Sequence, residues 1–316
     1  MAVEAQPPAR AHGARAGKAF KSGSAPRRRQ AIGIALTLPA LVTLAVTMLY
    51  PMAWTLWLSF NTRVTALQGT PDFVGFDNYL RIAASSGFTT ALLQTVGIVL
   101  ASFVLEAVLA LIVALALFRA LRGSRIFQAI VALPLMVAPV VGALAWRFIF
   151  ADGYGMIDTV AQHLGGEGPL WFADVWLART SVVVANLWLA LPFDILVLLA
   201  GLSSLPTEPL EAARVDGASP AQILRRIILP LLKPVISIIF VIRMADAFRI
   251  FDVVYVLTAS GPANRTDVLS TYIYRQMFSA FDFPGGAAAS IMLVIITSLA
   301  SLLVVVALRD RWQSEA

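Results

Sequence analysis

Four ionisable residues recur at every third position of one apolar stretch: Arg243, Asp246, Arg249 and Asp252. In a continuous helix, residues three apart lie on neighbouring turns, so each of these charges has an opposite charge within reach. Ionisable side chains in membrane-spanning helices are costly and face protein or water. We expect Arg243 and Asp246 to form structural ion pairs that join this helix to its neighbours. We expect Arg249 and Asp252 to line a path for a polar solute.

Three further residues have the chemistry to contact a hydroxyl-rich solute such as a sugar. Asp194 is an acid in another apolar stretch, and Trp188 and Tyr255 offer aromatic rings on which the apolar face of a sugar can stack. The sequence leaves open whether Asp194 faces a cavity or a neighbouring helix. Glu106 is a similar lone acid, and Trp146 is expected to be an interfacial anchor.

The composition places these residues in a membrane protein. Of 316 residues, 59% are hydrophobic and only 13% are charged, whereas soluble proteins carry about 25%. There is no cysteine, and His12 and His163 are the only histidines. These counts exclude a disulfide framework and argue against a metal centre or a catalytic triad. We therefore expect an all-α polytopic membrane protein without catalytic or metal-binding residues.

Six apolar segments are long enough to cross a bilayer. They cover residues 31–60, 90–118, 126–150, 179–203, 234–257 and 285–308. Pro51 and Pro192 fall inside two of these segments, where a missing backbone donor is expected to bend the helix.

The basic residues predict how these six spans are oriented. Most of the 24 Lys and Arg residues lie in the tail 1–30, in two loops and in the tail 309–316, whereas the loop 151–178 has neither residue type. Because basic residues favour the cytoplasmic side, both termini and the loop 206–234 are predicted to be cytoplasmic. We interpret the basic N-terminal tail, which we expect to be disordered, as an orientation signal and not as a nucleic-acid binding segment.

The loop 206–234 predicts two short helices separated by a turn. Thr207 suits a helix start, and Gly217 stands where a left-handed residue would end that helix. Ser219 and Gln222 have the spacing of a capping box, with Pro220 at the first helical position. An amphipathic connector resting on lipid headgroups has the same pattern, so periodicity alone leaves both interpretations open.

The spacing within this loop resembles the EAA motif of the membrane subunits of ABC importers. The resemblance rests on "EAA", a glycine after three further residues, and "I-x-LP" after another nine residues. It implies a helix that docks on a separate ATPase subunit and couples ATP binding to transport. The residues implied in coupling are Glu211, Ala212, Ala213, Asp216, Gly217, Ile227, Leu229 and Pro230.

Two further stretches resemble sugar-importer permeases of the maltose and lactose type: "FVGFDNYLRI" at 73–82 and "FDVVYVLTASGPANRTDVLSTYIYRQMF" at 251–278. The chain departs from the family pattern at Ala259-Ser260 and Gln94-Thr95, which weakens the inference of the substrate. The resemblance runs from about residue 30 to the C-terminus and implies a six-span permease domain, residues 31–308, in a bacterial inner membrane. The implied substrate is a di- or oligosaccharide of the trehalose or maltose type. Glycerol phosphate or another polyol is the alternative.

The resemblance also implies the partners: a second homologous permease, two ATPase subunits that hold the ATP and magnesium, and an extracellular solute-binding protein. This chain has no nucleotide-binding glycine motif of its own and is expected to bind no cofactor. Two other classes compete with this interpretation. An intramembrane enzyme would use Asp194, Asp246 or Asp252 as acid and base, and a proton-coupled transporter would use the same acids without partner subunits.

Overall fold

The computed structural model describes residues 26–62, 71–119, 124–166, 168–259, 261 and 265–313. Apart from one isolated bridge between Asn61 and Phe73, all regular structure in these residues is helical. The predicted all-α class is confirmed. The chain forms two compact units, Met1–Ala53 and Trp54–Ala316.

Five helices of the described chain are long and apolar enough to span a membrane, and a bent helix pair is a sixth candidate. The six predicted spans are therefore confirmed if the bent pair counts as one span. The five helices are Ile34–Ser59, Ser86–Phe118, Val175–Ser203, Pro220–Ala247 and Phe283–Val306, and the bent pair is Ile126–Met136 with Pro139–Ile149.

The first and last helices extend beyond the predicted membrane domain 31–308. Helix α1 (Pro26–Leu44) begins inside the predicted tail 1–30, whose residues 1–25 lie outside the described part. The last helix, α14 (Phe283–Gln313), continues through most of the predicted tail 309–316. The apolar spans themselves, from Ile34 and up to Val306, lie within 31–308, and the two tails stay predictions.

Two π-helical turns each lie just before a proline. One covers Ala45–Leu49, ahead of α2 (Tyr50–Ser59) with Pro51, and the other covers Leu224–Ile228, ahead of Pro230. A proline ring clashes with the carbonyl four residues earlier, and the wider turn moves that carbonyl aside. Pro51 therefore changes the backbone hydrogen-bonding pattern of the helix over the preceding turn, Ala45–Leu49. Pro192 lies within one uninterrupted helix, and the bend expected there stays a prediction.

The third predicted span is not straight. Helix α5 (Ser124–Ala132) passes through a 3₁₀ turn (Leu133–Met136) and then gives way to α6 (Pro139–Ile149), at an angle of 99° across the break. Ala138 has an extended backbone, with ψ of 137°. The residue before a proline avoids the helical region, so the position of Pro139 explains where the helix stops.

The fifth predicted span, 234–257, is broken in the structure. Helix α11 (Leu229–Ala247) ends before Phe248, and a short helix, α12 (Asp252–Thr258), begins four residues later. The side chains of Phe248 and Ile250 are buried at the break, and the Ile250 carbonyl accepts a hydrogen bond from the Ser270 hydroxyl. Tertiary contacts thus replace the helical hydrogen bonds here, and the assumption of one continuous helix was wrong.

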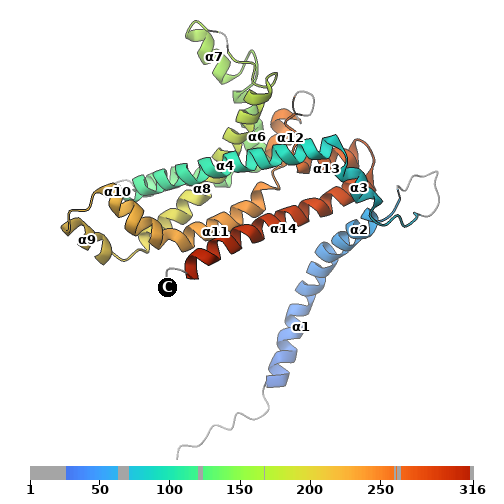
Figure 1. The fold of residues 1–316 in the computed structure, drawn as a ribbon, viewed down its shortest axis with the longest axis horizontal. Helices are drawn as coiled ribbons and strands as arrows, with labels where there is room; N and C mark the ends of the chain where they lie inside the picture. The colour runs from blue at the N-terminus through green and yellow to red at the C-terminus, as the bar shows by residue number, and fades with distance from the viewer. Residues whose placement is uncertain are drawn as a thin grey trace, which may run out of the picture. The chain divides into compact units, whose positions relative to one another are not determined.

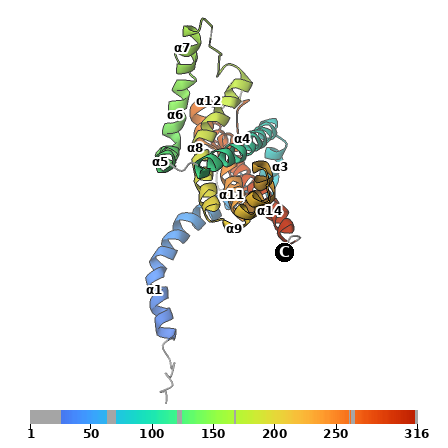
Figure 2. The same ribbon diagram turned by 90° about the vertical axis from the view of Figure 1, so that its left-hand side faces the viewer.

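The second unit is a bundle built around α8 (Val175–Ser203). This helix packs against α4 (Ser86–Arg119) and α11, and α11 packs against α14 (Figure 1; Figure 2). One apolar core lies between α4, α8 and α11 and extends to Leu210 in the loop after α8. A second core joins α6, α8 and α12, and a third joins α4, α13 (Leu269–Phe278) and α14.

The segment that resembles the sugar-permease pattern in the first loop is held by polar contacts. Asn78, in α3 (Asp77–Ala83), donates to the carbonyls of Ser59 and Asn61 at 2.9 Å each. Arg81 contacts both carboxylate oxygens of Asp282, at 2.7 and 3.3 Å. These bonds tie the loop to the start of α14.

We expect Asn78→Ala to cost more stability than Arg81→Met. Asn78 is buried, so its loss leaves two carbonyls unsatisfied, at about 1–3 kcal/mol. Arg81 is 52% exposed, and an exposed ion pair contributes about 0–1 kcal/mol. Unfolding of the detergent-solubilised chain in denaturant measures both values. The reverse order would show that the ion pair, and not the amide, holds this loop.

Candidate coupling surface and solute-path residues

The loop after α8 forms the helix–turn–helix that its sequence predicts. Helix α9 covers Glu208–Val215 and ends at Gly217, whose φ of +74° lies in the left-handed region. The Ala218 amide donates to the Ala213 carbonyl at 2.9 Å, which closes the turn. The predicted capping box is present, with Ser219 and Gln222 bonded to each other's backbone amides.

One correction concerns the second helix of this loop, which we predicted to be short. It begins with Pro220–Ile223, passes through the π turn and runs into α11 without a break. The uninterrupted stretch from Pro220 to Ala247 is 28 residues, or about 40 Å at 1.5 Å per residue. Any displacement of the loop is therefore transmitted directly along the fifth span.

Helix α9 leaves most of its surface free. Its anchor is Leu210, which is buried in the core between α4, α8 and α11. Glu211, Ala212 and Asp216 are exposed, and Val215 is 87% exposed although it is apolar. We call this set of four residues the α9 surface. An exposed apolar residue flanked by two acids and an alanine is suited to docking on another protein.

The second half of the predicted coupling set lies in a different environment. Ile227 packs against the same core as Leu210, Leu229 is half-buried, and Pro230 is exposed at the start of α11. Ala213 is half-buried and Gly217 is exposed in the turn. The motif therefore combines exposed residues of the α9 surface with residues that pack on the bundle.

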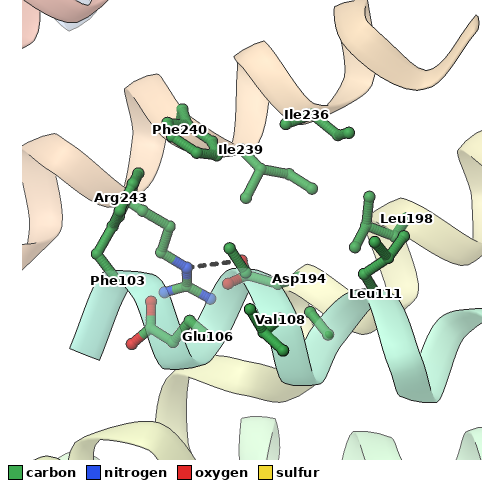
Figure 3. Close-up of a pocket in the computed structure, with 12 residues that line it drawn as sticks. Phe103, Glu106, Val108, Leu111, Asp194, Leu198, Ile236, Ile239, Phe240 and Arg243 are labelled. Carbon is green, nitrogen blue, oxygen red and sulfur yellow. Dashed lines mark hydrogen bonds and ion pairs between the residues drawn. The ribbon is translucent and has the colours of Figure 1, made fainter. Parts of the chain in front are cut away.

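A buried charge cluster lies deeper in the bundle, where α4, α8 and α11 meet (Figure 3). Arg243 donates from Nε to Asp194 Oδ1 at 2.7 Å, and its Nη2 donates to the Ala190 carbonyl. Glu106 accepts a hydrogen bond from Asn186 Nδ2 at 3.2 Å. Glu106 and Asp194 are only 5% and 2% exposed. The cluster thus joins three helices through charges that water hardly reaches.

These contacts bear on two predictions. Arg243 forms an ion pair with Asp194 on α8, so it joins its helix to a neighbouring helix as we expected. Asp246 is exposed, and the structure shows no ion pair for it within the described residues. We left open whether Asp194 faces a cavity or a neighbouring helix, and it does both: its Oδ1 accepts a hydrogen bond from Arg243, and it lines a cavity between α4, α8 and α11. No pattern in the sequence identifies Asp194 as the partner of Arg243, because the two residues are 49 positions apart.

A cavity of about 260 Å³ adjoins the cluster. Glu106, Asp194 and Arg243 form its polar part, and apolar side chains from α4, α8 and α11 form the rest, Phe103 and Phe240 among them (Figure 3). The rings of these two residues meet edge to face at 4.2 Å. Within the described residues no group of three or more His, Cys, Asp or Glu side chains is arranged to hold a metal ion.

The other predicted path residues lie near the break in span five. Arg249 is exposed within the break, and Asp252 is half-buried in the first turn of α12, where the helix dipole favours an acid. Trp188 is partly exposed and its ring meets the Trp146 ring at 6.2 Å. Because the helix is interrupted, Arg249 and Asp252 do not continue one face with Arg243.

Tyr255 belongs to an aromatic cluster that we did not predict. Its ring is 43% exposed and stacks on Phe251 at 5.2 Å, and it meets Tyr274 of α13 at 5.1 Å. Phe278 extends the cluster from Tyr274 at 4.9 Å. Phe251 and Tyr255 are four residues apart, as are Tyr274 and Phe278, and this helical spacing could have indicated the two pairs within the helices. The cluster offers several ring faces beside two charged groups, Arg249 and Asp252.

Comparison with known proteins places this architecture in a family. The model described as "Binding-protein-dependent transport system inner membrane component" matches residues 107–312, which include the α9 surface and all of the buried charge cluster except Glu106. The chain belongs to this family. It is therefore a multi-pass membrane permease component of an ABC importer.

Named relatives of this permease carry sugars or a sugar-like phosphate. A trehalose/maltose transport system permease protein of Thermococcus litoralis is 34% identical over 85% of this chain and 90% of its own length. A trehalose transport system permease protein of Mycobacterium tuberculosis is 34% identical over 86% and 87%. A glycerol-3-phosphate permease protein of Yersinia pestis is 33% identical over 83% and 88%.

The fold itself matches a solved structure. A bacterial ABC transporter that imports the acidic polysaccharide alginate contains a chain with a TM-score of 0.79 to this one, at 24% identity. The match covers 90% of this permease and 96% of that chain. At this identity the comparison supports the helical architecture and says nothing about the solute.

Proposed function

We propose that this permease forms, with a second homologous permease, the path of an ATP-driven importer for a di- or oligosaccharide. Two ATPase subunits dock on the α9 surfaces from the cytoplasm, and an extracellular binding protein delivers the sugar. Both chain termini are cytoplasmic, in agreement with the distribution of basic residues. The observation that carries the proposal is the exposed α9 surface, which α8 and the continuous α11 connect directly to the bundle core.

The coupling in this proposal is mechanical. ATP binding draws the ATPase subunits together, and each α9 follows the subunit on which it is docked. Because the Pro220–Ala247 stretch has no break, the displacement reaches Arg243 and the break that follows α11. The bundle then alternates between inward-open and outward-open states. ATP and magnesium contact only the partner subunits.

The sugar is proposed to pass the aromatic cluster at Tyr255. Exposed rings can stack on the apolar face of a sugar, and Arg249 and Asp252 supply polar groups for its hydroxyls. The relatives that carry trehalose or maltose support this substrate class. Glycerol phosphate is the second candidate, because Arg249 is exposed here and a glycerol-phosphate permease is a relative.

Reconstitution in proteoliposomes tests the proposal. The complete system, with both permeases, both ATPases and the binding protein, is expected to take up disaccharide only with ATP. This permease alone is expected to transport nothing and to hydrolyse nothing. Sugar uptake by this chain alone under a proton gradient would overturn the proposal in favour of a secondary transporter.

Asp252→Ala tests the solute path separately. We expect sugar-stimulated uptake to fall about tenfold, because a hydrogen bond to a charged group contributes about 1.5–3 kcal/mol. The complex is expected to assemble normally, as judged by co-purification of its subunits. Tyr255→Leu, which keeps an apolar side chain but removes the ring, is expected to lower uptake in the same way. Loss of assembly in Asp252→Ala would show that this acid has a structural role.

A further inference from the structure

A groove of about 510 Å³ follows the seam between α4 and α8. It shares no lining residue with the cavity at the buried charge cluster. Gln94, Gly97 and Leu105 line it from α4, and Trp176 and Arg179 line it from α8. The groove is therefore a site of its own, and neither the coupling surface nor the proposed solute path uses it.

The groove changes in polarity along its length. Gln94, Arg179 and Thr180 lie toward the end where α4 and α8 begin, whereas Ala101, Leu105 and Val183, further along, are apolar or small. From Gln94 to Leu105 the helix rises about 16 Å. Half of the hydrocarbon core of a bilayer is about 15 Å thick. The groove thus matches an amphiphile that lies in one leaflet.

Arg179 gives the polar end its charge. Its guanidinium lies over the Trp176 ring at 4.8 Å, and Nη2 donates to the Arg265 backbone carbonyl at 3.4 Å. Its Nε is buried without a hydrogen-bond partner, and no ion pair is found for this arginine among the described residues. A carbonyl cannot neutralise the positive charge. An anionic group at this end of the groove, which Arg179 lines, would supply the missing negative charge.

Gly97 keeps the lower part of the groove open. A β-carbon added at this position would meet no atom within 4 Å, so the space over the helix is free. Trp176, in the first turn of α8, is 72% exposed, as expected of an aromatic residue at the membrane interface. Along the groove, the free space at Gly97 is followed by the charge of Arg179 and then by the interfacial ring of Trp176. The acyl chain, the phosphate and the headgroup of a phospholipid follow one another in the same order.

We propose that this groove binds a glycerophospholipid. The phosphodiester accepts hydrogen bonds from Arg179, and one acyl chain lies along Gly97 toward Leu105. The proposal rests on the membrane orientation given above, which places the Arg179 end in the outer leaflet. It does not depend on which solute is carried. A lipid in this groove would lie against the interface between α4 and α8. Transport would therefore depend on the lipid composition of the membrane.

Photo-crosslinking of the full chain in proteoliposomes tests this site. One probe is a phosphatidylglycerol with a diazirine on its acyl chain, and the other is the matching diacylglycerol, which lacks the phosphate. Mass spectrometry is expected to find the phospholipid on peptides that contain residues 93–105 or 176–183. We expect labelling by the diacylglycerol to be about tenfold weaker, because it cannot make the charge-assisted bonds.

Three variants sharpen the result. Arg179→Gln is expected to lower phospholipid labelling about tenfold, and Gly97→Leu to block it by filling free space without disturbing neighbours. Arg265→Gln is the control, since it removes a nearby charge but keeps the carbonyl that Arg179 contacts. Equal labelling by both probes, unchanged labelling of Arg179→Gln, or displacement by excess inorganic phosphate would each overturn the proposal.

The readout needs no transport. If the complete system fails to import sugar but the groove is still labelled, then the proposed function fails and the lipid site stands. If import proceeds and labelling is absent, then only the lipid site fails.

Discussion

Glu211→Lys is expected to abolish ATP-driven uptake while the chain still inserts into the membrane. Glu211 is exposed on α9, so the change disturbs no packing in the bundle. Charge reversal at a docked surface replaces an attraction by a repulsion and leaves the partner's charge unpaired, which costs about 2–5 kcal/mol. Association with the ATPase is then about thirtyfold weaker or worse. Uptake in proteoliposomes, together with co-purification of the ATPase, measures the effect.

Glu208→Lys is the matched control for this variant. Glu208 is also exposed and acidic, but it is the first residue of α9, on the turn before the α9 surface. We expect its reversal to reduce uptake far less than reversal of Glu211. Equal loss in both variants would indicate a general requirement for negative charge on this loop. Unchanged uptake in Glu211→Lys would contradict coupling through α9.

The sequence predicted the parts of the permease that local interactions determine. The left-handed Gly217 and the capping box of Ser219 and Gln222 involve residues a few positions apart, and both are present in the structure. The spans were found because each is an apolar run of sufficient length. For the same reason their ends were less well predicted, since a helix continues past its apolar part when polar residues at its end can reach water.

The sequence did not predict the features that depend on contacts between residues far apart in the chain. No proline or glycine in the sequence marks the break after Ala247. The break depends on the burial of Phe248 and Ile250 and on the hydrogen bond from the Ser270 hydroxyl to the Ile250 carbonyl. In the same way, the sequence predicted that Arg243 forms an ion pair to a neighbouring helix but did not identify its partner, Asp194 on α8. Spacing shows which residues can reach each other within one helix. It carries no information about the helix that packs alongside.

The second large effect is expected from Arg243→Met, which should destabilise the chain by about 3–5 kcal/mol. Methionine fills most of the space of the arginine but leaves Asp194, at 2% exposure, without its ion pair. Glu106, at 5% exposure, keeps only its bond from Asn186. Unfolding of the detergent-solubilised chain in denaturant measures the loss. Arg249→Met, at an exposed position, is the control and is expected to change stability by about 0.5 kcal/mol or less.

The double variant Arg243→Met with Asp194→Leu separates two causes of that loss. If the cost comes from an unpaired buried carboxylate, removing the carboxylate as well is expected to restore most of the stability, because apolar residues of similar volume can replace a buried pair. If the double variant stays as unstable as the single one, the guanidinium must act mainly through its other contacts, the Ala190 carbonyl and the Phe193 ring. Restored stability without restored uptake would show that the charge pair between α8 and α11 is needed for the transport cycle and not only for the fold.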